Sequence, residues 1–334
     1  MAHRRLARLW NADKTERDQR SGTVAHATGQ WQTTDLKLSS DRRRSDTRMR
    51  WLFTAAALTT LVVTLLIIFI LFRDAWSFFV EVPKADLWTL GWFPRRGYFD
   101  VKTLVVGTLM VTGIAMLIAV PLGLGVAIYL SEFARPRVRK FLKPIIEILA
   151  GIPSVVLGYF AISFINPNII TALVGGANKA FNIAAAGVAV GILTVPIIAS
   201  VTEDALRAVP LSLREASYGL GARRVPTVFR VVLPASISGV VAALILGISR
   251  AIGETMVVAI AAGAVGGGLF STDPFKPGQT MTAAMAALGF GSDQVAGDGL
   301  AFQSLFFIGF LLFVFTLLLN LLGDRLVRRV REEY

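Results

Sequence analysis

The sequence predicts an all-α, polytopic membrane protein with six transmembrane helices, and composition and segment length are the observations that predict it. Of the 334 residues, 54% are hydrophobic and only 17% are charged, with a mean hydropathy of +0.62. These values are too apolar for an ordinary soluble domain. Six segments each offer the roughly 20 apolar residues that a hydrocarbon core about 30 Å thick requires. They are residues 51–72, 103–130, 144–165, 181–202, 236–265 and 301–323.

The basic residues predict how these helices are oriented. If the N-terminus lies inside, four segments are cytoplasmic and hold 26 of the 34 lysines and arginines: 1–50, 131–143, 203–235 and 324–334. The external segments hold seven, and Arg250 lies within an apolar segment. Cytoplasmic loops of membrane proteins carry such an excess of basic residues. Both termini are therefore expected in the cytoplasm, and the net charge of +12 indicates membrane orientation and not nucleic-acid binding.

Several kinds of chemistry are excluded or disfavoured by composition. The chain has no cysteine, which excludes disulfides, thiol catalysis and cysteine-ligated metals. Its two histidines, His3 and His26, both precede the first apolar segment, which argues against a metal site or histidine catalysis in the body of the protein.

The first hundred residues divide into two predicted segments. Residues 1–50 are polar and are expected to form a largely disordered cytoplasmic extension, with an arginine cluster that binds membrane lipid. Residues 51–102 are expected to hold the first transmembrane helix and an external loop. The aromatic side chains of this loop, including Trp76, Trp88 and Trp92, are expected at the membrane–water interface.

The loop at 203–235 carries its own helix signals. Ser212 and Glu215 have capping-box spacing, which predicts a helix over 213–220, with Gly219 and Gly221 at its end. Pro226 predicts a second helix through Val231, which Leu233-Pro234 would end. Such a pair of helices is either a docking surface or a positively charged surface loop.

The same loop holds a spaced signature of acidic, small and apolar residues: Glu215, Ala216, Ser217, Gly221, Val231, Leu233 and Pro234. This signature resembles the EAA loop of ABC importer permeases, with serine for the third small residue and valine for the usual isoleucine. The resemblance covers about 103–323 and implies a type I ABC importer (MetI-like) permease fold. It also implies that the loop is a coupling helix bound in a groove of an ATPase subunit. The chain has no Gly-x-x-x-x-Gly-Lys-Ser/Thr motif, so ATP and Mg²⁺ are expected on that partner, with no cofactor on this chain.

Two further segments, 149–156 and 250–256, resemble phosphate-import permeases of the PstC type more than those of the PstA type. The resemblance implies a bacterial cytoplasmic-membrane complex with four kinds of component besides lipid. These are this permease, a second permease of the PstA type, two ATPase subunits and an external phosphate-binding protein.

Arg250 and Glu254 are the only acid and base well inside one apolar segment. A charge at the centre of a bilayer is unfavourable by about 2.5–3.5 kcal/mol on insertion scales, so it needs a partner or a polar cavity. Their i, i+4 spacing allows simple neutralisation. The alternative is an anion pathway, in which the arginine fork binds phosphate. Glu254 would then hold Arg250 and accept the remaining proton of hydrogen phosphate, which sulfate lacks.

The other acidic residues near the segment ends are predicted to have no direct role in function. Glu132 and Glu147 are expected at the interface, and Glu203 and Asp204 are expected to face water. Three other functions stay open: a permease for sulfate or molybdate, a self-sufficient secondary transporter or channel, and a membrane anchor or phosphate-sensing scaffold. The sequence has no clear inverted repeat, which argues mildly against the secondary transporter.

Overall fold

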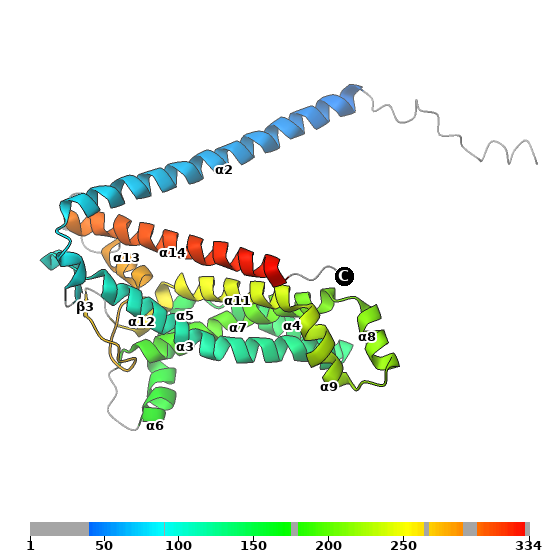
Figure 1. Ribbon diagram of the computed structural model, residues 1–334. Helices are drawn as coiled ribbons and strands as arrows, with labels where there is room; N and C mark the ends of the chain where they lie inside the picture. Colours follow the sequence, from blue (N-terminus) through cyan, green and yellow to red (C-terminus); the bar gives the residue numbers. More distant parts are fainter. Residues whose placement is uncertain (1–39, 90, 175–179, 264–266, 290–298, 331–334) are drawn as a thin grey trace, which may run out of the picture. The chain divides into compact units, whose positions relative to one another are not determined.

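The computed structural model describes residues 40–89, 91–174, 180–263, 267–289 and 299–330. The chain divides into one unit up to Leu66 and a second from Ile67 to Tyr334. Helix α2 (Ser40–Glu81) begins in the first unit and continues into the second (Figure 1). Residues 40–50, expected in the polar extension, are helical, and residues 1–39 lie outside the described residues.

The first unit consists, in its described part, of the N-terminal two thirds of α2. Every side chain from 47 to 66 is exposed, including the large apolar ones, which suits a helix surrounded by lipid. Four threonine hydroxyls in this stretch donate to the carbonyl four residues earlier: those of Thr54, Thr59 and Thr64 at 2.8 Å and that of Thr60 at 3.1 Å. These bonds give the threonine hydroxyls hydrogen-bond partners, which the hydrocarbon of a membrane cannot provide.

The predicted set of membrane-spanning helices is confirmed in type and number when one bent pair counts as a single span. Five described helices are long and apolar enough to cross a membrane, and the bent pair Arg224–Ala235 and Ile237–Ile252 is the sixth. The five are Thr47–Glu81, Val101–Phe133, Ser154–Val174, Ile183–Ala208 and Leu300–Arg329.

The second unit contains most of the secondary structure. Its helices after α2 are α3 (Val101–Ile128), α4 (Pro136–Ala150), α5 (Ser154–Phe160), α6 (Thr171–Val174), α7 (Ile183–Ala208), α8 (Leu211–Gly219), α9 (Arg224–Thr227), α10 (Leu233–Ala235), α11 (Ile237–Ile252), α12 (Met256–Ala261), α13 (Met281–Gly289) and α14 (Leu300–Val330). Three π-helical stretches join neighbouring helices: η3 (Tyr129–Phe133), η4 (Ala161–Ile170) and η5 (Val228–Val232). Residues 324–330, expected in a C-terminal tail, continue α14.

The predicted bounds of the third segment, 144–165, are wrong. Residues 144–150 belong to the separate helix α4, and the apolar helix begins at Ser154, because Pro153 lacks an N–H and disfavours helical backbone in the residue before it. The helix also continues beyond residue 165, the predicted end of the segment. It passes Pro167 in the wider π-turn of η4, where the Asn168 side-chain amide donates to the Phe164 carbonyl at 2.9 Å.

The predicted fifth segment, 236–265, is interrupted. Helix α11 ends at Ile252, and α12 begins at Met256 after a three-residue break. The loop that follows α12 contains the short helix α13, whose side chains from Met281 to Ala284 are buried.

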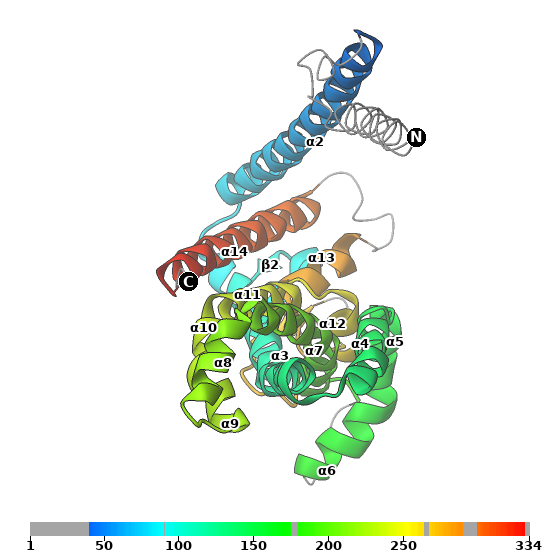
Figure 2. The same ribbon diagram turned by 90° about the vertical axis from the view of Figure 1, so that its right-hand side faces the viewer.

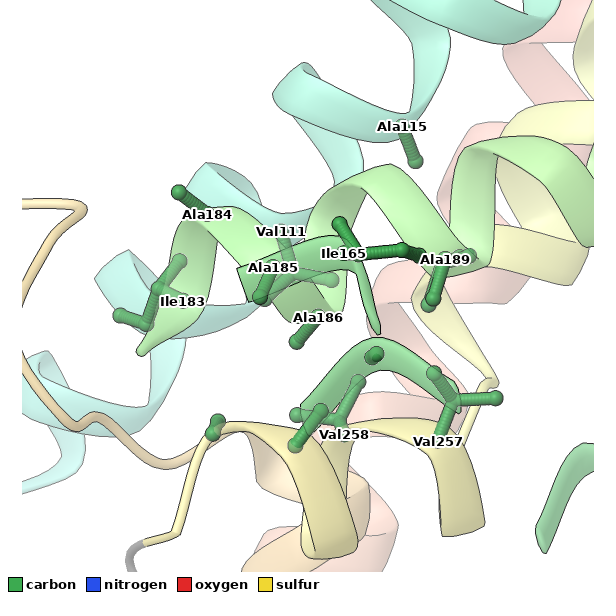
Figure 3. Close-up of a cluster of buried hydrophobic side chains, with 14 of the residues drawn as sticks. Val111, Ala115, Ile165, Ile183, Ala184, Ala185, Ala186, Ala189, Val257 and Val258 are labelled. Atoms are coloured by element: carbon green, nitrogen blue, oxygen red, sulfur yellow. The ribbon is translucent and has the colours of Figure 1, made fainter. Parts of the chain in front are cut away.

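The core of the second unit lies where α3 and α7 cross, with η4, α5 and α12 packed around them. Figure 3 shows the alanines of α7 between Val111 and Ala115 of α3 on one side and Val257 and Val258 of α12 on the other. Small residues allow this close approach. A Cβ built on Gly187 would lie 2.7 Å from Ile114 Cβ, and one on Gly191 would lie 2.9 Å from the Ala115 carbonyl.

A small sheet adds to the expected all-α fold. Strands β1 (Gly91–Phe93), β2 (Tyr98–Phe99) and β3 (Gly268–Leu269) pair antiparallel in the order β2-β1-β3, with Trp92 opposite Phe99. Trp92 is 1% exposed and packs on Phe99, so the expectation that it anchors at the interface is wrong. Trp76 and Trp88 are exposed, as interfacial anchoring requires.

We predict that Gly187→Ala destabilises the protein by about 1–3 kcal/mol, because the added methyl overpacks the α3–α7 contact. A lower thermal unfolding midpoint in detergent would show it. Gly113→Ala in α3 is the matched control, since a Cβ there meets no heavy atom within 4 Å. Equal midpoints for the two variants would contradict the packing argument.

Candidate functional site

The loop between α7 and α11 forms a compact helical unit at one end of the second unit's helices, where Figure 1 and Figure 2 place α8 and α9. Helix α8 is N-capped by Pro210 with no side-chain cap bond. The predicted capping box is therefore wrong, because Pro210 restarts the helix ahead of Ser212 and leaves Ser212 within the first turn. Pro210 also keeps Val209 extended, which ends α7.

The predicted end of α8 is confirmed. Gly221 has a φ of 81°, a left-handed conformation that glycine adopts without a Cβ penalty. The Ala222 amide donates to the Ser217 carbonyl at 3.1 Å, and the Gly221 amide donates to the Tyr218 carbonyl at 2.9 Å. These two bonds form a Schellman motif. The Ser217 hydroxyl also lies 2.9 Å from the Thr227 hydroxyl, which joins α8 to α9.

The helix ends one residue after the predicted stop at Leu233-Pro234. The helix that starts at Arg224 continues through η5 and α10 to Ala235, and then bends by 72° into α11. The Leu233 amide bonds to the Val228 carbonyl, five residues back, so the helix widens immediately before Pro234. The bend follows at Ser236, whose hydroxyl bonds to the Leu233 carbonyl at 3.1 Å.

The seven residues of the EAA-like signature differ in exposure. Glu215, Ala216, Gly221 and Pro234 are exposed, whereas Ser217, Val231 and Leu233 are half-buried. Leu233 packs with Leu213 against a buried cluster of Ala127, Leu206, Val209 and Val232. The exposed members, with the 91% exposed Leu220, form the outer surface of the loop, and the others attach it to α3 and α7.

Arg214 is the main polar attachment of this loop, and sequence reasoning missed it. Its guanidinium donates to the Val209 carbonyl at 2.6 Å, to the Leu206 carbonyl at 2.8 Å and to the Glu132 carboxylate at 2.9 Å. Glu132, expected at the interface, is 6% exposed and lies in η3 at the end of α3. One arginine therefore joins α8 to the ends of both α3 and α7. We name this the Arg214 clamp.

A second buried carboxylate lies nearby on α7. Glu203 was expected to face water, but it is 1% exposed and pairs with Arg139 at 2.6 Å and Lys143 at 3.4 Å. Both cations come from α4, so this ion pair fastens α4 to α7. The expectation for Asp204 is confirmed, since its side chain is 67% exposed. The one signal for Glu132 and Glu203 in the sequence was an acid at the end of an apolar segment near basic loops.

The break between α11 and α12 brings Arg250 and Glu254 together. An Arg250 Nη2 lies 3.5 Å from Glu254 Oε2. Glu254 itself lies in the break, and its Oε1 accepts the Val257 amide at 3.4 Å. Its carbonyl accepts the Thr282 hydroxyl of α13 at 2.8 Å, so the interrupted backbone keeps partners.

The two side chains of this pair differ in exposure. Glu254 is 4% exposed and Arg250 is 48% exposed. A separation of 3.5 Å is longer than the 2.7–2.9 Å or so of a strong charge-assisted hydrogen bond. The arginine is therefore only loosely held, with much of its guanidinium accessible.

A helical membrane fold with an EAA-like signature on the exposed surface of one loop is typical of importer permeases. The comparisons with known proteins agree. Residues 119–332 match the family described as "Binding-protein-dependent transport system inner membrane component". The match spans more than half of the chain, which therefore belongs to this family.

Individual relatives narrow the comparison. The chain is 35% identical over 256 residues to phosphate transport system permease protein PstC 1 of Mycobacterium tuberculosis, covering 71% of this chain and 75% of that protein. It is 29% identical over 301 residues to PstC of Pasteurella multocida, covering 85% and 88%. A PstA 1 protein of Mycobacterium tuberculosis aligns over a shorter stretch, 185 residues at 36% identity, covering 54% and 58%.

Solved structures show the same fold. A bacterial alginate ABC transporter, in complex with an alginate pentasaccharide-bound periplasmic protein, matches with a TM-score of 0.60 at 17% identity, covering 86% of this chain and 98% of that chain. The inward-facing MetNI methionine ABC transporter matches with a TM-score of 0.52 at 22% identity, covering 70% and 96%. The implied MetI-like permease fold is thereby confirmed.

We predict that Glu203→Gln lowers the free energy of unfolding by about 1–3 kcal/mol, because it weakens a charge-assisted bond to the 26% exposed Arg139. Thermal unfolding in detergent measures the change. Asp204→Asn is the matched control on the next residue and should change stability by less than about 1 kcal/mol. A larger loss from Asp204→Asn than from Glu203→Gln would contradict the assignment.

Proposed function

We propose that this chain is the PstC-type permease of an ATP-driven phosphate importer. It provides the translocation pathway together with a second permease of the PstA type. Two ATPase subunits, which carry ATP and Mg²⁺, and an external phosphate-binding protein complete the complex. The chain lies in the bacterial cytoplasmic membrane, with both termini and the α8 loop in the cytoplasm.

The observation that carries the proposal is the construction of the α8 loop. Its outer surface presents Leu211, Tyr218 and Leu220 beside the Glu215 carboxylate, and all four side chains are exposed. Apolar side chains on a short capped helix suit recognition by a groove in another protein. The Arg214 clamp ties this surface to the ends of two membrane helices, so a movement of the bound partner is transmitted to the bundle.

The energy for transport would come from the partner subunit and not from this chain. The sequence has no phosphate-binding loop for ATP, so hydrolysis is assigned to the partner that binds α8. ATP-driven closure of the ATPases would move α8, and the clamp would carry this motion to α3 and α7. The spans would then alternate between outward-facing and inward-facing states.

The pathway is assigned to the break between α11 and α12. Arg250 offers an accessible guanidinium, which can donate two parallel hydrogen bonds to a phosphate. Glu254 is almost fully buried and already accepts the Val257 amide, so it serves mainly to position Arg250. A carboxylate next to the pathway would favour hydrogen phosphate, whose hydroxyl can donate to it, over sulfate, which has no proton to donate.

Other oxyanions, sulfate or molybdate, are the second candidate substrates, because an arginine fork also suits them. A self-sufficient transporter or channel is the alternative of another class. Reconstitution of the permease pair with ATPase and binding-protein subunits separates these functions. We expect ATP-dependent uptake of phosphate in preference to sulfate. Flux through this chain without ATP would overturn the importer assignment, and preference for sulfate would overturn the substrate alone.

In the same assay, Arg250→Ala should lower phosphate uptake by about 10- to 100-fold, the loss expected when a charge-assisted bond is removed. Glu254→Gln should give a smaller decrease, because it loosens the arginine without removing it. Lys276→Ala, an exposed cation in the loop before α13, is the control and should transport normally. Normal uptake by both pathway variants in assembled complexes would reduce the pair to structural neutralisation.

Arg214→Ala should uncouple ATP hydrolysis from transport, because it removes the bonds that join α8 to α3 and α7. We expect the phosphate transported per ATP hydrolysed to fall by about fivefold or more while the complex still assembles. Arg230→Ala removes an exposed cation of the same loop and should leave the ratio unchanged. An unchanged ratio in Arg214→Ala would show that the clamp is not part of the coupling.

A further inference from the structure

A basic cavity lies beside the Arg214 clamp, between η3, α4 and the end of α7. Its volume is about 640 Å³, within the range of small-molecule sites. Its lining includes Arg139, Lys140 and Lys143 of α4, Arg207 of α7 and one carboxylate, Glu147. Neither the proposed pathway nor the coupling loop uses this cavity.

The charges around the cavity leave its cations only partly neutralised. Arg139 and Lys143 pair with the buried Glu203, and Lys143 also lies 3.5 Å from Asp204. Lys140 and Arg207 form no ion pair with any described residue, and both are exposed. Four cations face three carboxylates once Glu147 is included, so the cavity keeps one positive charge in excess.

Helix α4 has the character of a helix at the membrane surface. None of its residues is buried, and Val138, Phe141, Ile145 and Ile148 form an exposed apolar stripe at helical spacing. Arg139 and Lys143 lie on the side that contacts α7, where both pair with Glu203. A helix with one apolar and one basic face lies in the plane of the membrane interface. The stripe is thereby placed against the acyl region of the membrane, and the cavity, on the other side of α4, at the level of lipid headgroups.

We propose that this cavity binds the phosphate group of an anionic phospholipid, such as phosphatidylglycerol. Lys140 and Arg207 donate to the phosphodiester oxygens, and Arg139 and Lys143 add positive potential from behind. The Glu147 carboxylate repels a free phosphate dianion but can accept a hydrogen bond from a glycerol headgroup. This feature favours a lipid over inorganic phosphate as the source of the phosphate group.

The test compares lipid retention by the purified full-length protein, using native mass spectrometry and thermal unfolding. The wild type should retain phosphatidylglycerol over phosphatidylcholine, and millimolar inorganic phosphate should not displace it. The Lys140→Ala/Arg207→Ala double variant should lose this preference by about tenfold or more. The Lys140→Arg/Arg207→Lys double variant keeps both charges and should retain the lipid.

The matched control is Arg135→Ala/Arg137→Ala, which removes two exposed cations next to or in α4 that do not line the cavity. It should bind the lipid like the wild type, and all variants should melt alike in phosphatidylcholine. Equal phosphatidylglycerol retention by the Lys140→Ala/Arg207→Ala variant would overturn the site. Protection by inorganic phosphate alone, or loss of lipid when the second permease binds, would overturn the lipid assignment. None of these measurements depends on transport.

Discussion

The guanidinium of Arg214 is the interaction on which the proposed coupling depends. It is only 12% exposed, and three acceptors around its two terminal nitrogens stabilise the buried charge. Two of those acceptors are carbonyls at the end of α7, and the third is the Glu132 carboxylate at the end of α3. A lysine has the charge but not this geometry. Helix α8 consequently cannot shift without either moving both membrane helices or breaking a buried charge pair.

The same end of the bundle holds a second buried carboxylate, and the two ion pairs attach different elements to the bundle. Glu132 fastens the loop, whereas Glu203 fastens α4. Away from this end, α3 and α7 are held by small residues and dispersion contacts, which have no directional requirement. The arrangement thus combines an end fixed by buried ion pairs, where a partner would act, with a closely packed helix contact made of small apolar side chains.

Local sequence patterns predicted most of the helices. They could not predict the buried ion pairs, because the two partners of each pair are far apart in the sequence. Hydropathy located the six apolar segments, and Gly221 marked the end of α8, because each feature depends on a few neighbouring residues. The start of α8 was missed because Pro210 competes with the capping box. Glu132 and Glu203 were misplaced because their partners lie 82 and 64 residues away in sequence. No local spacing encodes such a pairing, and an acid at the end of an apolar segment looks the same whether paired or solvated.

The break after α11 places Arg250 and Glu254 in different environments. The i, i+4 spacing placed Arg250 and Glu254 on one helix face but predicted nothing about the exposure of either side chain. In the structure the acid is buried and hydrogen-bonded to the backbone that begins α12, whereas the base keeps nearly half of its surface accessible. Hydrocarbon would not stabilise a half-exposed guanidinium held by one 3.5 Å contact, so that surface must meet water, an anion or another subunit. Because α13 also bonds to the carbonyl of Glu254, any movement of that helix would reach Arg250 through its buried partner.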